Sequence, residues 1–223
     1  MNFKIQMSGL KKQFGGNPVL DGVDLEISSD TITAIIGKSG SGKSVLLKLI
    51  ADIYSLDAGT IDCVRILESG ETVPIALSDI GFSYMFQNNA LFDSLTAFEN
   101  VALPLSEGKL KVDPSTIRNT VDDLFEQLDL SSARNRFPGE LSGGMNKRVA
   151  FARALVTQPK VVLFDEPTTG LDPERKFTVF DMIERYREQF GFSALLVSHD
   201  IPDVYAIVDS IAWLDQGKIQ FLG

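Results

Sequence analysis

The sequence predicts an α/β fold: a mainly parallel β-sheet with helices, an antiparallel β subdomain at the N-terminus, and an inserted α-helical subdomain. Strand and helix patterns alternate along most of the 223 residues, which is typical of a parallel sheet. The first ~35 residues carry only short β patterns, and the stretch from about 95 to 157 carries only helical ones. We therefore expect one domain over 1–223, with a core of about 1–90 and 158–223 and a helical subdomain of about 91–157.

Each element is assigned from its local pattern. Strands are expected where β-branched and apolar residues run between turn residues, as in Thr31–Ile36, which ends at Gly37. Helices are expected where apolar residues recur every three or four positions, as from Ile117 to Leu128 after the N-cap and proline of Asp113-Pro114. The expected strands are Phe3–Met7, Val19–Leu20, Leu25–Ile27, Thr31–Ile36, Gly59–Leu67, Thr72–Ala76, Val161–Phe164, Ser193–Val197, Ile211–Leu214 and Ile219–Leu222. The expected helices are Ser44–Ile53, a helical region of about 96–130, Gly143–Thr157, Lys176–Gln189 and Ile201–Val208.

The composition is that of an ordinary globular protein, with 44% hydrophobic and 23% charged residues. The net charge of −9 argues against a nucleic-acid partner bound through bulk positive charge. A single cysteine, Cys63, and a single histidine, His199, exclude a disulfide framework and a cysteine- or histidine-rich metal site. The sequence has neither an apolar run of ~20 residues nor a signal-peptide pattern, so we expect it to fold in the cytoplasm.

A glycine-rich loop stands between an expected strand and an expected helix. The glycines allow backbone N–H groups to approach phosphate oxygens, and the helix presents its positive N-terminal end to them. Lys43 is expected to reach the β- and γ-phosphates of a nucleotide, and the Ser44 hydroxyl to bind Mg²⁺. A solvated Gly/Ser loop is the alternative. The loop is Gly37-Lys38-Ser39-Gly40-Ser41-Gly42-Lys43-Ser44, which fits the phosphate-loop pattern G-x-x-x-x-G-K-[ST].

Two carboxylates follow the apolar strand pattern Val161–Phe164. Asp165 suits the Mg²⁺ shell of a phosphate-loop NTPase. Glu166 is then placed to polarise the attacking water as a general base. An acidic turn after a buried strand is the alternative.

A third motif opens the expected helix at Gly143. Ser142 suits the N-cap, and Gly143 and Gly144 leave the helix end bare enough to meet an anion. Together with the phosphate loop and the Asp165-Glu166 strand end, the sequence Leu-Ser-Gly-Gly resembles the signature motif of ATP-binding-cassette (ABC) ATPases. The resemblance covers essentially the whole chain and implies a RecA-like P-loop NTPase core that binds ATP with Mg²⁺. The chain departs from the family at Met145, where glutamine is usual.

The resemblance also implies roles for four further residues. Gln87 resembles the glutamine that touches the metal and the water, with a surface glutamine as the alternative. His199 resembles the switch histidine that contacts the γ-phosphate, with a structural histidine as the alternative. Asp172 resembles the loop residue that communicates between two sites. Phe14 resembles the aromatic that stacks on adenine, with a core phenylalanine as the alternative.

What the family resemblance implies is a site shared between two copies of the chain. Ser142 and Gly144 are expected not to reach phosphates bound at Lys43 of the same chain. In the family, two copies pack head to tail, and each ATP lies between one phosphate loop and the other copy's signature helix. The implied partners are a second copy and an integral-membrane permease, with the chain on the cytoplasmic face of the inner or plasma membrane.

A closer resemblance is to the ATPases of Mla/MCE-type lipid transport systems. It is carried by Asn89–Leu105, Met145 and Asp165–Pro173. It implies (phospho)lipid transport, an MCE-domain lipid-binding partner, and a groove for the permease's coupling helix formed partly by Tyr84–Phe98. ATPases of lipoprotein release, macrolide export and cell division share most of these residues, and a regulator or scaffold in a membrane complex is the alternative to a transport motor.

Overall fold

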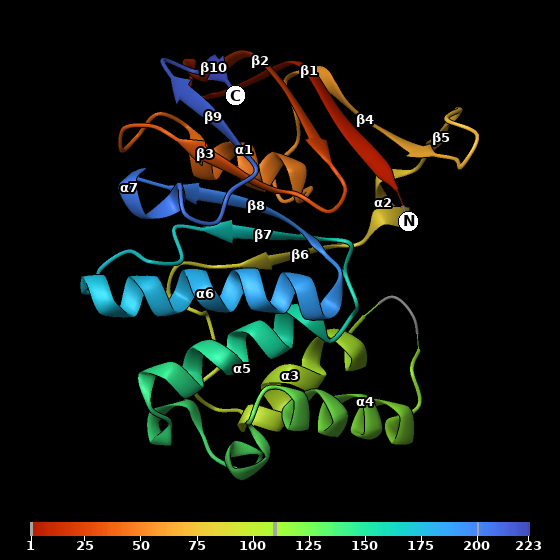
Figure 1. Ribbon diagram of the computed structural model, residues 1–223, viewed down its shortest axis with the longest axis vertical. Coiled ribbons are helices and arrows are strands. Elements are labelled where there is room, and N and C mark those ends of the chain that lie inside the picture. Colours follow the sequence, from red (N-terminus) through yellow and green to blue (C-terminus); the bar gives the residue numbers. More distant parts are fainter. Residues whose placement is uncertain (1, 109–110, 200) are drawn as a thin grey trace. The chain divides into compact units, whose positions relative to one another are not determined.

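The computed structural model describes residues 2–108, 111–199 and 201–223. The chain divides into two compact units. The core unit comprises the residues up to Gln87 together with Lys160–Gly223, and the helical unit comprises Asn88–Pro159. Figure 1 shows the elements of each unit along the chain.

The core unit contains a six-stranded sheet in the order β10-β9-β3-β8-β7-β6. The pairs β9/β3, β3/β8, β8/β7 and β7/β6 are parallel, and only β10 runs antiparallel to its neighbour β9 (Figure 1). The predicted mainly parallel sheet is therefore confirmed. The strands are β3 (Ile32–Ile36), β6 (Phe82–Met85), β7 (Val161–Asp165), β8 (Ser193–Ser198), β9 (Ser210–Asp215) and β10 (Lys218–Leu222).

A four-stranded antiparallel sheet in the order β2-β1-β4-β5 forms the predicted β subdomain. Its first two strands differ from expectation, because the three short strands predicted there are two strands of 12 residues joined at Gly15-Gly16. Buried and exposed residues alternate along much of β1, so Ser8, Lys11 and Gln13 belong to its solvent face. Lys12 is buried, and its ammonium group donates to Asp57. The strands are β1 (Phe3–Phe14), β2 (Asn17–Ser28), β4 (Ala58–Ile66) and β5 (Thr72–Ile75).

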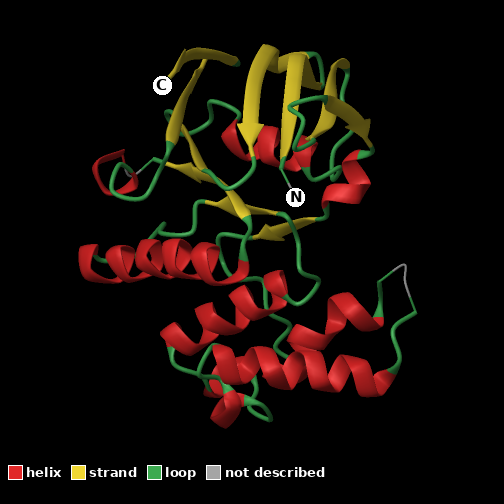
Figure 2. Cartoon of the chain, turned by 45° about the vertical axis from the view of Figure 1, so that its right-hand side comes forward, coloured by secondary structure: helices red, strands yellow, loops and turns green. Residues whose placement is uncertain are grey.

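Helix α1 (Lys43–Ile50) lies between the two sheets of the core unit (Figure 2). Its apolar residues Leu46, Leu47 and Ile50 join one buried cluster with residues of both sheets. Burial on every side explains why this short helix is apolar almost all round. The remaining helices of the unit are α2 (Leu77–Ile80), α6 (Pro173–Phe190) and α7 (Ile201–Val204).

Strand β6 was not predicted. It is four residues long, lies at the edge of the sheet, and three of its four residues are only half-buried, so it lacks both alternation and an apolar run. Its register with β7 places Tyr84 opposite Leu163. This register brings the aromatic stretch before Gln87 alongside the strand that ends in Asp165.

The helical unit contains α3 (Ala97–Ser106), α4 (Pro114–Gln127) and α5 (Gly143–Leu155). The helical region expected over about 96–130 is thus two helices. The Asp113 carboxylate caps α4, as the sequence predicts. A capping box between Thr96 and Glu99, which was not predicted, starts α3. The fully buried Asn100 donates to the carbonyls of Phe92, Leu95 and Thr96, so it fixes the loop before α3.

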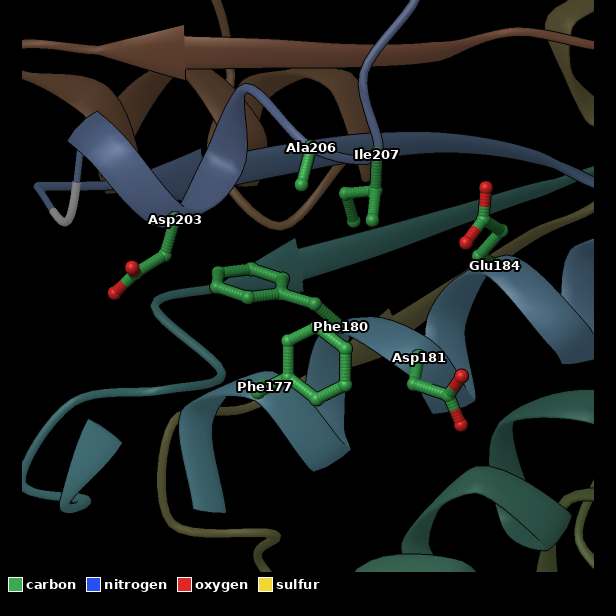
Figure 3. A pocket seen from close by; sticks show the side chains of 7 residues that line it. All are labelled: Phe177, Phe180, Asp181, Glu184, Asp203, Ala206 and Ile207. Carbon is green, nitrogen blue, oxygen red and sulfur yellow. The ribbon is translucent and has the colours of Figure 1, made fainter. Parts of the chain in front are cut away.

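A groove of about 290 Å³ separates α6 from the segment containing α7 (Figure 3). Phe177 is 71% exposed at its edge, whereas Phe180 is buried. Ala206 and Ile207 lie on the other side. Among the described residues, no helix combines the length and the hydropathy needed to cross a membrane.

Candidate active site

The candidate active site lies at the carboxyl ends of the parallel strands β3, β7 and β8. The phosphate loop follows β3, Asp165 ends β7, and His199 follows β8. Carboxyl ends of parallel strands meet at one edge of a sheet, and ligands of open α/β sheets bind there. The topology therefore brings three motifs together that are far apart in the sequence.

Packing as well as ligand approach explains two glycines of the phosphate loop. A Cβ atom on Gly37 would lie 2.2 Å from the Leu214 carbonyl oxygen. Gly42 precedes α1 with φ of 100°, and a Cβ there would lie 2.8 Å from Leu20 Cδ2. The hydroxyl of Ser41 is buried and has no hydrogen-bond partner among the described residues, as expected of a group that a phosphate oxygen would satisfy.

Lys43 is 4% exposed and lies within the loop that precedes it. Its ammonium group donates to the carbonyl oxygens of Gly37 at 2.9 Å and Lys38 at 3.0 Å. Burial lowers the pKa of Lys43, and the nearby carboxylates of Glu166 and Asp165 partly offset this effect. The acceptors at Gly37 and Lys38 are both neutral carbonyl oxygens, so the hydrogen bonds hold the ammonium group in the loop without neutralising its charge.

Asp165 is bound on both of its carboxylate oxygens. Ser44 Oγ donates to Oδ1 at 2.6 Å, and Tyr84 Oη donates to Oδ2 at 2.7 Å. Burial, and then the hydrogen bond to Asp165, raise the pKa of the Tyr84 hydroxyl, which stays protonated as a donor. The sequence placed Tyr84 in a permease-binding groove, whereas the structure directs its hydroxyl to Asp165. Its position on the strand beside β7 was the signal that was missed.

Glu166 lies directly after β7 in a left-handed conformation with φ of 49°. Its backbone N–H donates to the Val197 carbonyl, and its Oε2 accepts from Thr169 Oγ1 at 2.8 Å. His199 Nδ1 lies 3.4 Å from the same Oε2. The structure therefore brings the expected base and the expected switch histidine together, and adds Thr169, to which the sequence assigned no role of its own.

The other predicted site residues of the core unit are Gln87, Asp172 and Phe14, and none of them is buried. Gln87 is exposed and makes no side-chain hydrogen bond within the described part of the chain. The Asp172 carboxylate caps α6 by accepting from the Arg175 N–H at 3.0 Å. Phe14 is 42% exposed and meets the ring of Tyr54 edge-on at 5.4 Å. This exposure fits a ring that stacks on a base better than a core phenylalanine.

The signature motif lies in the helical unit, where Ser142 caps α5 by accepting from the Met145 N–H at 3.2 Å. Gly143 and Gly144 are exposed, and a Cβ on either would meet no atom within 4 Å. Glycine in a helix costs ~0.5–1 kcal/mol relative to alanine. Within the described part of the chain, packing therefore leaves room for a larger side chain at both positions.

The donor set at Asp165 fits Mg²⁺. This ion keeps several waters and takes one or two protein oxygens together with nucleotide phosphates. Ser44 Oγ and Asp165 Oδ1 supply such oxygens next to the phosphate loop. Among the described residues, no group of three histidine, cysteine or acidic side chains is arranged to hold a metal ion.

The fold and this site define a phosphate-loop nucleotide-binding protein. The sequence profile of the family described as ABC transporter matches residues 20–169. The chain therefore belongs to the ABC transporter family, as the signature motif predicted.

Proteins similar to the chain are named as ATP-binding subunits of importers. A sulfate/thiosulfate import ATP-binding protein of Shewanella oneidensis is 34% identical over 98% of this chain and 61% of that protein. An Fe(3+) ions import ATP-binding protein of Vibrio cholerae is 32% identical over 100% of this chain and 61% of that protein. An aliphatic sulfonates import ATP-binding protein of Xanthomonas axonopodis pv. citri is 35% identical over 96% of this chain and 69% of that protein. The chain thus spans about three fifths of the length of the first two relatives.

Proposed function

We propose that the chain is the ATP-hydrolysing subunit of an ABC transporter, working as a dimer beneath a membrane permease. The observation that carries this proposal is the arrangement around Asp165 and Glu166: a metal-binding oxygen pair and a positioned base lie together with the phosphate loop. Family membership and the import ATP-binding relatives support it.

Each group has a role in this proposal. Lys43 and the α1 N-terminus bind the β- and γ-phosphates, and Ser41 donates its unpaired hydroxyl to a phosphate oxygen. Mg²⁺, when bound at Ser44 and Asp165, neutralises charge on the phosphates. Glu166 accepts the proton of the attacking water on Oε1, because Oε2 is engaged by Thr169 and His199. Phe14 stacks on the adenine ring, and Gln87 approaches the metal and the water.

The second half of the site comes from another copy of the chain. We place Ser142, Gly143 and Gly144 of one copy against the nucleotide bound by the other, with Asp172 near the contact between copies. The open space above both glycines supports this arrangement, since a phosphate could approach the helix end closely. Differential binding of ATP and ADP would then move the copies together and apart.

The relatives and the sequence resemblance suggest different transported substrates. The three relatives are named for import of sulfate/thiosulfate, Fe(3+) ions and aliphatic sulfonates, and none of the three is named for lipid transport. Their names support ATP-driven transport in general, and they give no support to lipid cargo or to an MCE-domain partner. Both of those proposals rest on the resemblance carried by Asn89–Leu105, Met145 and Asp165–Pro173 alone. Co-purification of the tagged chain with its permease, followed by mass spectrometry of bound lipids and of accessory proteins, separates a lipid system from an ion importer.

The function is tested by Glu166→Gln in the purified permease complex. We expect turnover to fall by roughly 100-fold or more while MgATP binding persists. Glu188→Gln, an exposed change of the same kind on α6, is the matched control and should leave turnover intact. Normal turnover in Glu166→Gln would remove Glu166 as the base, and no ATP hydrolysis by the wild-type complex would contradict the proposal as a whole.

A further inference from the structure

The hydrogen bond between Tyr84 and Asp165 is a feature of the site that the motifs do not explain. Asp165 is 9% exposed, so each of its carboxylate oxygens needs a partner within the protein or from a ligand. Ser44 satisfies Oδ1, the oxygen on the phosphate-loop side, and Tyr84 satisfies Oδ2. The tyrosine therefore engages one carboxylate oxygen, and the other oxygen faces Ser44.

The sheet register explains why Tyr84 reaches this carboxylate. Tyr84 lies opposite Leu163 in the parallel pair β6/β7. Leu163 and Asp165 are two residues apart and project from the same face of the strand. Asp165 is thus about 6.6 Å further along β7, a distance that a long side chain leaning along the strand can span.

Packing also fixes the position of the Tyr84 ring, in addition to the hydrogen bond of its hydroxyl. The ring packs against Phe86 with centroids 4.6 Å apart, and the residue is half-buried. A ring fixed in this way leaves the hydroxyl little freedom to leave Asp165. Phenylalanine at this position would keep the packing and lose only the donor, which makes it a clean test.

We infer that Tyr84 is a positioning residue of the magnesium site, acting through Asp165. Its hydroxyl holds Oδ2 so that Oδ1 remains beside Ser44, where the two oxygens together receive Mg²⁺ bound to ATP. Tyr84 itself touches neither the nucleotide nor the metal. This inference rests on the proposed function, because it assumes a MgATP site at the phosphate loop.

The test compares the affinity for MgATP with that for ATP in excess EDTA, measured by calorimetry on the purified permease complex. In the wild type we expect Mg²⁺ to increase ATP affinity. In Tyr84→Phe we expect MgATP affinity to fall roughly tenfold, the effect of losing a hydrogen bond to a charged group, while affinity in EDTA stays within about twofold. Tyr186→Phe removes a hydroxyl from a tyrosine on α6 that is 1% exposed, and should change neither value.

A double variant tests whether Tyr84 acts through Asp165 or through another part of the protein. If Tyr84 acts through Asp165, Tyr84→Phe should cause no further loss of the Mg²⁺-dependent affinity when Asp165→Asn is already present. An unchanged Mg²⁺ effect in Tyr84→Phe, an equal loss with and without Mg²⁺, or full additivity with Asp165→Asn would each overturn the inference. A wild type that binds ATP equally with Mg²⁺ and with EDTA would instead count against the proposed function.

Discussion

Glycine lies at the N-terminal ends of α1 and α5, and its surroundings differ between the two helices. At α1, Gly42 is surrounded by the chain itself, and a Cβ there would meet Leu20 and Val19. At α5, Gly143 and Gly144 face open space. The first glycine is explained by packing within one copy, whereas the second pair has no explanation within one copy. This difference fits the proposed shared site, in which the α5 end of one copy meets the nucleotide bound at the α1 end of another.

The largest effect is expected from Ser142→Arg at the α5 end. The long, charged side chain would fill the space that we assign to nucleotide and partner, so ATP-driven dimerisation should be lost. Loss of the cap should cost only about 1 kcal/mol, so the chain should stay folded. Light scattering in saturating MgATP on a Glu166→Gln background measures this, and a retained dimer would contradict the shared site.

Lys43→Ala should have the next largest effect, at the α1 end. Removing charge-assisted contacts to two phosphates should weaken ATP binding roughly 100-fold. Calorimetry of the purified complex measures the affinity. Lys160→Ala removes the same charge from an exposed position and serves as the control. Equal affinities of the two variants would show that Lys43 does not bind phosphate.

Gly42→Ala should lower the free energy of unfolding by about 3 kcal/mol. A left-handed φ of 100° and a contact of 2.8 Å to Leu20 both oppose a methyl group there. Gly70→Ala shares a positive φ of 85° but has no neighbour within 4 Å, so it should cost only about 1 kcal/mol. The difference between the two variants in urea unfolding measures the cost of the contact with Leu20. Equal losses of unfolding free energy would show that this contact costs nothing.

Gly144→Ala should change the free energy of unfolding least, and it should raise it rather than lower it. Alanine is the better helix former and meets nothing within 4 Å, so the chain should gain about 0.5 kcal/mol in unfolding free energy. The same change should weaken ATP-driven dimerisation. A variant that is destabilised and dimerises normally would reverse the comparison between the two helices.

The sequence was sufficient where a motif combined with a strong local pattern. Buried strands such as β3 and β7 are apolar throughout, and the caps at Asp113 and Ser142 are local in sequence, so both could be predicted. The sequence did not predict features that depend on how distant segments pair in the folded chain. Strand β6 is too short to show a period, and the contact between Tyr84 and Asp165 depends on the register that β6 adopts beside β7. Thr169 near Glu166 likewise depends on the turn that folds them together.

The strand order also has a consequence for how the protein is made. Strand β3, which leads into the phosphate loop, has β8 on one side and β9 on the other. Both neighbours come from the last part of the chain, after residue 192. During synthesis the phosphate loop therefore leaves the ribosome well before β8 and β9, the strands that flank β3. The helical unit, Asn88–Pro159, is a contiguous segment made between them. A nascent chain stopped before β8 would carry the phosphate-binding sequence without the framework that shapes it.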